Sequence, residues 1–286
     1  MRCSLGRRCT ALRRGGRTAV LVAVAVVGVA ASATGTAAEP SLVPLRSKQQ
    51  IPVFYNQGIA RVPHGWILTG TLSPIPDTDV IARTDEQFAV VKENKPAIPQ
   101  PWRAQGYNHI GDIDVVGNVV YAPFEQQDYS LGHQVTARFD ARTLKYLGAV
   151  EVAQHENSFV AVDPARKIAY SMDHFDGDEL LRYDVARGFK PLSPLKLSTT
   201  LQHTQGASVG SGAVWISTSD ASNDVYRVDI KTGHVDLVGR IDDPPGEGEG
   251  IDATRLPSGA LHALVLDPDM TKVWVEHFAA PRSGQV

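Results

Sequence analysis

Short apolar runs separated by turn residues recur along most of the chain. Aligned on the small residue near the start of each unit, five units are found at positions 58, 111, 158, 206 and 250, with separations of 53, 47, 48 and 44 residues. A period of about 40 to 50 residues is typical of stacked or radially arranged repeats. The units begin with Gln57–Val62, Ile110–Val115, Asn157–Val162, Gln205–Val209 and Glu249–Ala253. The spacing therefore predicts five structural repeats.

Each unit continues with further short runs that have the character of β-strands. The second runs are Trp66–Leu68, Val119–Ala122, Ile168–Tyr170, Val214–Ser217 and Leu261–Leu266. The third runs alternate apolar and polar residues, and they are Asp79–Arg83, Val135–Phe139, Leu180–Asp184, Val225–Asp229 and Lys272–Glu276. Four of the five units add a fourth run, such as Val235–Gly239 after the turn Lys231–Gly233. Four short strands joined by turns in every repeat are typical of a propeller blade.

The fifth unit has no fourth strand of its own, which indicates how the ring closes. The N-terminal segment Ser41–Phe54 is otherwise unassigned, and Leu42–Leu45 or Ile51–Phe54 can supply the missing strand. Such closure removes exposed sheet edges. The prediction is an all-β fold, a single β-propeller of five four-stranded blades closed by an N-terminal strand. A six-bladed propeller is the alternative.

The first 38 residues differ from the rest of the chain. They hold six arginines and no acidic residue, followed by the apolar run Ala19–Ala31. This pattern predicts a secretory signal peptide over residues 1–38, with small residues at Ala31–Ala33 and Thr36–Ala38 as candidate cleavage sites. The run is too short to span a bilayer. The Arg7-Arg8 pair leaves the choice between the Sec and twin-arginine routes open. We expect a secreted, extracellular protein whose propeller domain is 39–286.

Charge and cysteine content narrow the classes of partner. Without the six leader arginines, 22 basic residues face 31 acidic ones, a net charge of 22 − 31 = −9. Both cysteines, Cys3 and Cys9, lie in the leader. No cluster of Lys and Arg is visible, which argues against nucleic-acid binding. A divalent cation or a cationic small molecule suits the charge better, and we expect a monomer with no membrane span after cleavage.

The radial arrangement brings polar residues that open the units toward one place. The first strand of each propeller blade lines the central channel, so the acidic, glycine-rich stretch Pro245–Asp252 joins residues that are distant in sequence. The converging set is Gln57, His109 or Asp112, Glu156 or Asn157, Gln205, and Glu249. Hard cations such as calcium bind carboxylate and amide oxygens. Asp112, Asn157, Gln205 and Glu249 are therefore the candidate metal ligands.

Histidines beside the unit openings are candidates for proton transfer. His109, His155 and His203 recur from unit to unit, and imidazole titrates near neutral pH or binds transition metals. With Glu249 they form the predicted catalytic set. Gln57, Trp102, Tyr107 and Glu156 are the predicted substrate-binding residues. The alternative is that these polar groups only satisfy one another's hydrogen bonds. His174, in the acidic stretch Met172–Glu179, is interpreted as part of a solvated turn.

Several phrases of the sequence resemble known propeller families. The stretch Val225–Val235 resembles the blade phrase of secreted bacterial propellers, and the whole mature chain is similar to the gluconolactonase and senescence-marker lactonase superfamily. Glu249–Asp252 resembles the blade openings of five-bladed calcium-activated apyrases. These resemblances imply a calcium ion, or another divalent cation, at the channel mouth with Glu249 as its main anionic ligand. The departure is that only one or two of the five openings carry a carboxylate, which leaves the metal's identity open.

Three functions follow from these observations. The preferred hypothesis is a secreted enzyme that acts on a small molecule at the channel mouth by metal- or His-assisted hydrolysis or lactone-type ring opening. The alternatives are a non-catalytic extracellular binding or scaffold propeller, and a metal-independent isomerase or cyclase. The sequence holds no Gly-x-Ser-x-Gly elbow, no His-Glu-x-x-His and no phosphate loop.

Overall fold

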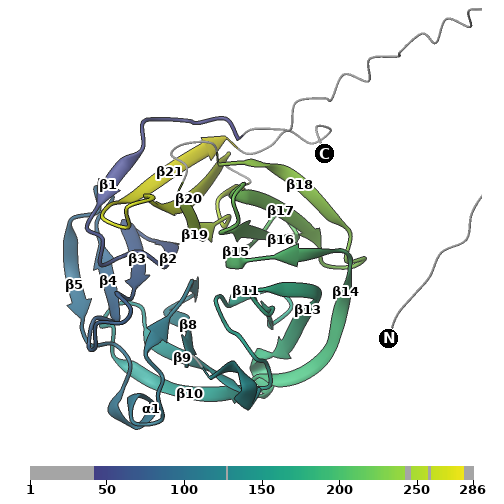
Figure 1. Cartoon of the computed structure of the whole chain (residues 1–286), viewed down its shortest axis with the longest axis horizontal. Coiled ribbons are helices and arrows are strands. Elements are labelled where there is room, and N and C mark those ends of the chain that lie inside the picture. Colours follow the sequence, from purple (N-terminus) through teal and green to yellow (C-terminus); the bar gives the residue numbers. More distant parts are fainter. Residues whose placement is uncertain (1–41, 127, 242–245, 257–258, 280–286) are drawn as a thin grey trace, which may run out of the picture. The chain divides into compact units, whose positions relative to one another are not determined.

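The computed structural model describes residues 42–126, 128–241, 246–256 and 259–279. Five antiparallel sheets surround a central axis, as Figure 1 shows. The predicted all-β fold, a five-bladed propeller with four strands per blade, is confirmed. The predicted signal peptide lies outside the described residues. Within the part that is described, no helix has the length and hydropathy needed to cross a membrane.

The strands of each blade follow one another outward from the axis. Blade 1 contains β2 (Gly58–Val62), β3 (Gly65–Gly70), β4 (Val80–Thr84) and β5 (Val90–Asn94). Blade 2 contains β6 (His109–Ile110), β7 (Asp114–Val116), β8 (Val119–Glu125), β9 (Gln134–Asp140) and β10 (Tyr146–Val152). Its innermost strand is interrupted, because β6 and β7 both pair with β8.

The remaining blades repeat the pattern. Blade 3 contains β11 (Ala161–Asp163), β12 (Ile168–Ser171), β13 (Asp176–Asp184) and β14 (Lys190–Gln202). Blade 4 contains β15 (Thr204–Gly210), β16 (Ala213–Thr218), β17 (Asp224–Asp229) and β18 (Val235–Arg240). Blade 5 contains β19 (Glu247–Asp252), β20 (Ala260–Leu266) and β21 (Val273–Ala279). The short helices are α1 (Gln100–Arg103), η1 (Tyr129–Leu131) and η2 (Val185–Arg187).

The N-terminal strand β1 (Gln49–Ile51) completes blade 5 by pairing with β21. The predicted closure by an N-terminal strand is therefore confirmed, although β1 begins two residues before the proposed segment Ile51–Phe54 and shares only Ile51 with it. Upstream, Pro44 bridges Phe278, and the Ala279 N–H donates to the Val43 carbonyl at 2.8 Å. These contacts join the first described residues to β21.

Packing between neighbouring blades forms the core. The second strands β3 and β16 are buried along their whole length, because each blade packs between two others. Trp66 of blade 1, for example, lies in one apolar cluster with Leu264 and Val275 of blade 5. Burying such side chains is the main favourable term in folding.

Glycines allow the innermost strands to touch at the axis. A Cβ atom on Gly206 would lie 2.6 Å from the Glu249 carbonyl oxygen and 2.7 Å from the Gly250 Cα. One on Gly250 would lie 2.7 Å from the Gln57 carbonyl oxygen. Both contacts are with backbone, which cannot move aside cheaply. The small residue in each unit is therefore explained by close approach of the strands.

Asp112 joins these strands through its side chain. Its Oδ1 accepts the backbone N–H of Ile59 at 3.0 Å and of Ile113 at 2.9 Å. Its Oδ2 accepts the N–H of Ala207 at 3.0 Å and of Ile251 at 3.1 Å. The carboxylate thus binds blades 1, 2, 4 and 5. Its own backbone pairs with blade 3, where the Asp112 N–H donates to the Ser158 carbonyl at 2.8 Å.

A buried histidine pair lies where the N-terminal segment meets blade 5. His262 Nδ1 and His277 Nδ1 are 2.7 Å apart, and Arg46 donates to His277 Nε2 at 2.8 Å. His277 therefore accepts at Nε2 and donates from Nδ1 to His262, a pattern that suits two neutral rings. Burial, together with the charges of nearby arginines, lowers the pKa of His262 to about 3 and that of His277 to about 4. Both rings resist protonation in the folded state.

We expect this pair to make the protein less stable as pH falls from 7 toward 5. In the unfolded chain each histidine is protonated as pH falls through about 6.5, whereas in the folded state the two rings stay neutral down to about pH 3 to 4. Well below pH 6.5, each such ring reduces the free energy of unfolding by about 1.4 kcal/mol per pH unit. Thermal melts should show that His262→Gln loses less stability over this range than the wild type. The exposed His64→Asn is the control, and parallel pH curves for His262→Gln and wild type would contradict the assignment.

Candidate functional site

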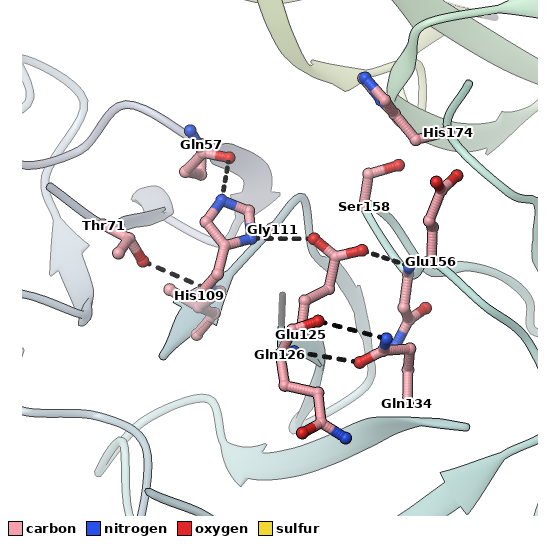
Figure 2. Close-up of polar contacts among 12 residues, drawn as sticks. Gln57, Thr71, His109, Gly111, Glu125, Gln126, Gln134, Glu156, Ser158 and His174 are labelled. Atoms are coloured by element: carbon pink, nitrogen blue, oxygen red, sulfur yellow. Dashed lines mark hydrogen bonds and ion pairs between the residues drawn. The ribbon is translucent and has the colours of Figure 1, made fainter. Parts of the chain in front are cut away.

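A polar pocket of about 230 Å³ lies at the end of the axis where the innermost strands begin. Figure 2 shows its side nearest blades 1, 2 and 3. The lining residues come from blades 2, 3, 4 and 5, and we call their cavity the axial pocket. They are His109, Glu125, Tyr129, Ser158, His174, Phe175, Gln205 and Glu247.

A histidine and a glutamate of blade 2 form the best-ordered pair in the axial pocket. The antiparallel register of β6 and β8 sets His109 opposite Glu125. His109 Nδ1 lies 3.0 Å from Glu125 Oε2, and its Nε2 lies 3.0 Å from Gln57 Oε1 (Figure 2). The Asn157 N–H donates to the other oxygen of Glu125. Both ring nitrogens of His109 therefore face side-chain oxygens, one of Glu125 and one of Gln57.

Two carboxyl groups of the axial pocket have pKa values shifted in opposite directions. Burial alone would raise the pKa of Glu125, but the hydrogen bond and charge of His109 and the Asn157 N–H bring it below its ordinary value. Glu247 is half-buried, and burial raises its pKa despite the opposing influence of His174, His109 and His203. Among the described residues, none makes a hydrogen bond with the Glu247 side chain. The surroundings of Glu125 therefore favour its ionised form, whereas the burial of Glu247 favours its protonated form.

Glu249 lies beside the axial pocket, and its carboxyl group joins the side-chain amides of Gln57 and Gln205. Its side chain is only 1% exposed. Its Oε1 accepts from Gln57 Nε2 at 3.4 Å, and its Oε2 accepts from Gln205 Nε2 at 3.0 Å. Burial and the neighbouring Glu247 raise the pKa of Glu249 well above its ordinary value. A continuous chain of contacts thus runs from Gln205 through Glu249, Gln57 and His109 to Glu125.

The loop between β12 and β13 forms the wall contributed by blade 3. His174 Nδ1 donates to the Thr204 carbonyl at 2.9 Å, and its ring centre lies 5.4 Å from that of His203. Glu156 Oε2 accepts the Phe175 N–H at 3.0 Å, and this hydrogen bond fixes the position of the loop. His174 was expected in a solvated turn and instead lines the pocket. This difference arises because the loop turns toward the channel mouth, so that His174 and Phe175 line the pocket.

Other predicted site residues lie elsewhere. His155 is exposed and donates from Nδ1 to the Tyr129 carbonyl at 2.8 Å, outside the residues that line the axial pocket. Tyr107 is buried in the apolar core of blades 1 and 2. Trp102 lies in the short helix α1, where its Nε1 donates to the hydroxyl of Tyr146 on β10 at 2.8 Å. Neither aromatic residue forms the rim of the axial pocket, because hydrophobic burial draws both away from it.

Of the four predicted metal ligands, Gln205 and Glu249 are in contact at 3.0 Å, whereas Asp112 and Asn157 are bonded to other groups. Both oxygens of Asp112 already accept two backbone N–H groups each. The Asn157 Oδ1 accepts from Gln154 Nε2 at 3.1 Å, and its Nδ2 donates to Val135. Within the described ranges, no group of three His, Cys, Asp or Glu side chains is placed to hold a metal ion. These residues do not fit the calcium site implied by the resemblance, so a divalent cation stays a prediction for metal analysis.

Sequence reasoning missed Glu125, Glu247, Tyr129 and Phe175 as pocket residues. The predicted residues open the first strands, whereas Glu125 ends a second strand, Tyr129 begins the short helix η1 and Phe175 lies in the loop between β12 and β13. Glu247 belongs to the acidic stretch Pro245–Asp252, from which only Glu249 was predicted as a site residue. The antiparallel return of β8 to the channel mouth is the feature that would have identified Glu125.

Comparisons with known proteins support the fold. No protein-family model matches the sequence, and no curated protein sequence matches it. The structure is similar to that of glutaminyl cyclase from Myxococcus xanthus, with a TM-score of 0.60 and 11% identity over 84% of this chain and 99% of that one. It is also similar to a luciferin-regenerating enzyme, with a TM-score of 0.50 and 11% identity over 80% of this chain and 78% of that one. At such low identity the likeness shows the propeller fold alone. Neither structure supports the resemblance to calcium-activated apyrases.

Proposed function

We propose that this chain is a secreted enzyme that moves protons on a small, amine-bearing substrate held in the axial pocket. One observation carries the proposal, namely that two carboxyl groups in the same pocket have pKa values pushed apart. Such pairs are typical of acid–base catalysis, because one group keeps its charge while the other, with a raised pKa, can give and take a proton. Glu247 is the proposed general acid and base. The Glu125–His109 pair is the proposed fixed partner that orients the substrate.

The charge of the lining favours an amine. Glu125 and Glu247 line the axial pocket, and among its described lining residues none is Lys or Arg. The rings of Tyr129 and Phe175 lie beside the carboxylates, with their centres 6.5 Å apart. Carboxylates with aromatic faces suit an ammonium group, through both charge and cation–π attraction.

The specific reaction we propose is cyclisation of an N-terminal glutaminyl residue. The structural likeness to a glutaminyl cyclase over 99% of that chain suggests which reaction to test first. In this reaction the α-amine nitrogen bonds to the side-chain amide carbon, and the bond from that carbon to the amide nitrogen breaks to release ammonia. The bound ammonium would first give one proton to Glu247, which passes it to solvent. In the attack that follows, Glu247 would take the second proton from the amine nitrogen and return it to the leaving nitrogen, and the released ammonia takes up a proton in solution. No net proton is consumed, so a single carboxyl group serves both steps.

Measuring ammonia release from glutaminyl dipeptides tests the proposal, with asparaginyl dipeptides and a panel of lactones assayed in parallel. We expect turnover of the glutaminyl peptides that is unchanged by EDTA, because the proton transfers are assigned to Glu247 and the His109 pair. Metal analysis of the purified protein accompanies the assay. Turnover of lactones only, abolished by EDTA, would contradict the proposal in favour of metal-assisted hydrolysis. No turnover of any substrate would favour a binding propeller.

A further inference from the structure

A second pocket, of about 280 Å³, lies beside blade 1 and takes no part in the site described above. We call it the loop pocket. Its walls are the loop between β3 and β4 and the segment that leads from α1 to β6. The lining includes Pro74, Ile75, Asp77, Arg103, Tyr107 and Asn108.

The loop pocket and the axial pocket are neighbours at the same end of blade 1. Gly58 pairs with Thr69, so the loop after β3 lies at the end where Gln57 meets His109. The Ile110 N–H also donates to the Thr71 hydroxyl at 3.1 Å (Figure 2). Asn108 lines one pocket and His109, the next residue, lines the other. Because consecutive side chains of an extended segment point to opposite faces, the two pockets lie on the two sides of this segment.

The walls of the loop pocket are held in place by charged groups. Arg103 donates to Asp77 at 2.5 Å and to Asp79 at 2.9 Å, which ties the loop to the α1 segment. Asp79 also accepts the Ile98 N–H at 2.6 Å. Inside the loop, the Thr78 hydroxyl donates to the Ile75 carbonyl at 2.8 Å. The cavity is therefore preformed, and binding of a ligand requires little loss of conformational entropy in its walls.

We propose that the loop pocket binds the residue that follows the reacting one in a peptide substrate. This inference rests on the proposed function, since it extends the same substrate beyond its N-terminal residue. Two proline rings and Ile75, which is 57% exposed, offer an apolar surface. Asp77 and Asp79 outnumber Arg103, so the local charge is negative. The pocket should accept an apolar or basic second residue and discriminate against an acidic one.

The test compares glutamine amide with glutaminyl-leucine amide and glutaminyl-glutamate amide on wild type and Ile75→Glu. The control variant is Val91→Glu, an exposed apolar residue on the outer strand β5. Ile75→Glu should raise KM for the leucine peptide by about tenfold with kcat unchanged, since the lost contact is present before and during reaction. Neither variant should alter the values for glutamine amide.

A binding measurement separates this inference from the proposed function. Norvalyl-leucine amide lacks the reacting amide, so calorimetric titration reports its affinity whether or not the protein is a cyclase. Weaker binding by Ile75→Glu, but not by Val91→Glu, supports the loop pocket even if no peptide is turned over. Equal affinity in wild type and Ile75→Glu, or no binding by the wild type, would overturn the inference. Turnover with equal KM for both lengths of substrate would do the same while leaving the proposed function intact.

Discussion

Glu247→Gln is expected to reduce kcat for glutaminyl peptides by about a hundredfold or more, which is the rate enhancement that a positioned general acid or base usually provides. The amide keeps the shape of the side chain but can no longer take a proton. KM should change little, because the Glu125–His109 pair still holds the substrate. Because burial raises the pKa of Glu247, the activity of the wild type should fall as pH drops through that raised value. The variant's residual activity should lack this acidic limb, as a pH profile of kcat would show.

Matched variants decide between the two carboxyl groups. Glu151→Gln changes an exposed glutamate on β10 and should leave kcat unaltered. Glu125→Gln removes the partner of His109 and should act mainly by disturbing substrate orientation, with a rise in KM. If Glu247→Gln kept full activity while Glu125→Gln lost its pH dependence and most of its kcat, the role of general base would pass to Glu125.

Asp112→Ala is expected to cost most of the protein's stability or to prevent folding. The change would leave four buried backbone N–H groups, those of Ile59, Ile113, Ala207 and Ile251, without their acceptor. Each buried unsatisfied group costs about 1 to 3 kcal/mol. Their sum approaches the whole stability of a typical domain, about 5 to 15 kcal/mol. Chemical denaturation of the purified variant, or its yield in the soluble fraction, measures the effect.

Asp114→Ala provides the comparison within the same blade. Asp114 is also buried, but within the described part of the chain it accepts only the N–H of Val162 at 2.7 Å and that of Val115 at 2.7 Å. Its loss should therefore cost about half as much. The exposed Asp176→Ala, on β13, should cost little. Equal stability losses for Asp112→Ala and Asp114→Ala would show that the axis does not depend on the carboxylate that joins four blades.

The prediction of Asp112 as a metal ligand illustrates why site chemistry is hard to infer from sequence. A carboxylate in a glycine-rich opening has the same appearance whether it binds a cation or backbone N–H groups. Only the positions of Ala207 and Ile251, which are 95 and 139 residues away, reveal that its oxygens are already occupied. The same holds for Glu125, whose role follows from its register with His109.

The sequence by itself determined the propeller. Alternation of apolar and polar residues is a local property of a strand, and a repeat of such strands with a small residue at each opening has few ways to bury its apolar faces other than around an axis. The tertiary structure decided which polar groups meet. Glu125, His174 and Glu247 come from a strand end, a loop and a different blade, and their distances depend on strand register and on the rotation between blades. Proton transfer depends on those distances, so the candidate site became visible only when the five blades were assembled.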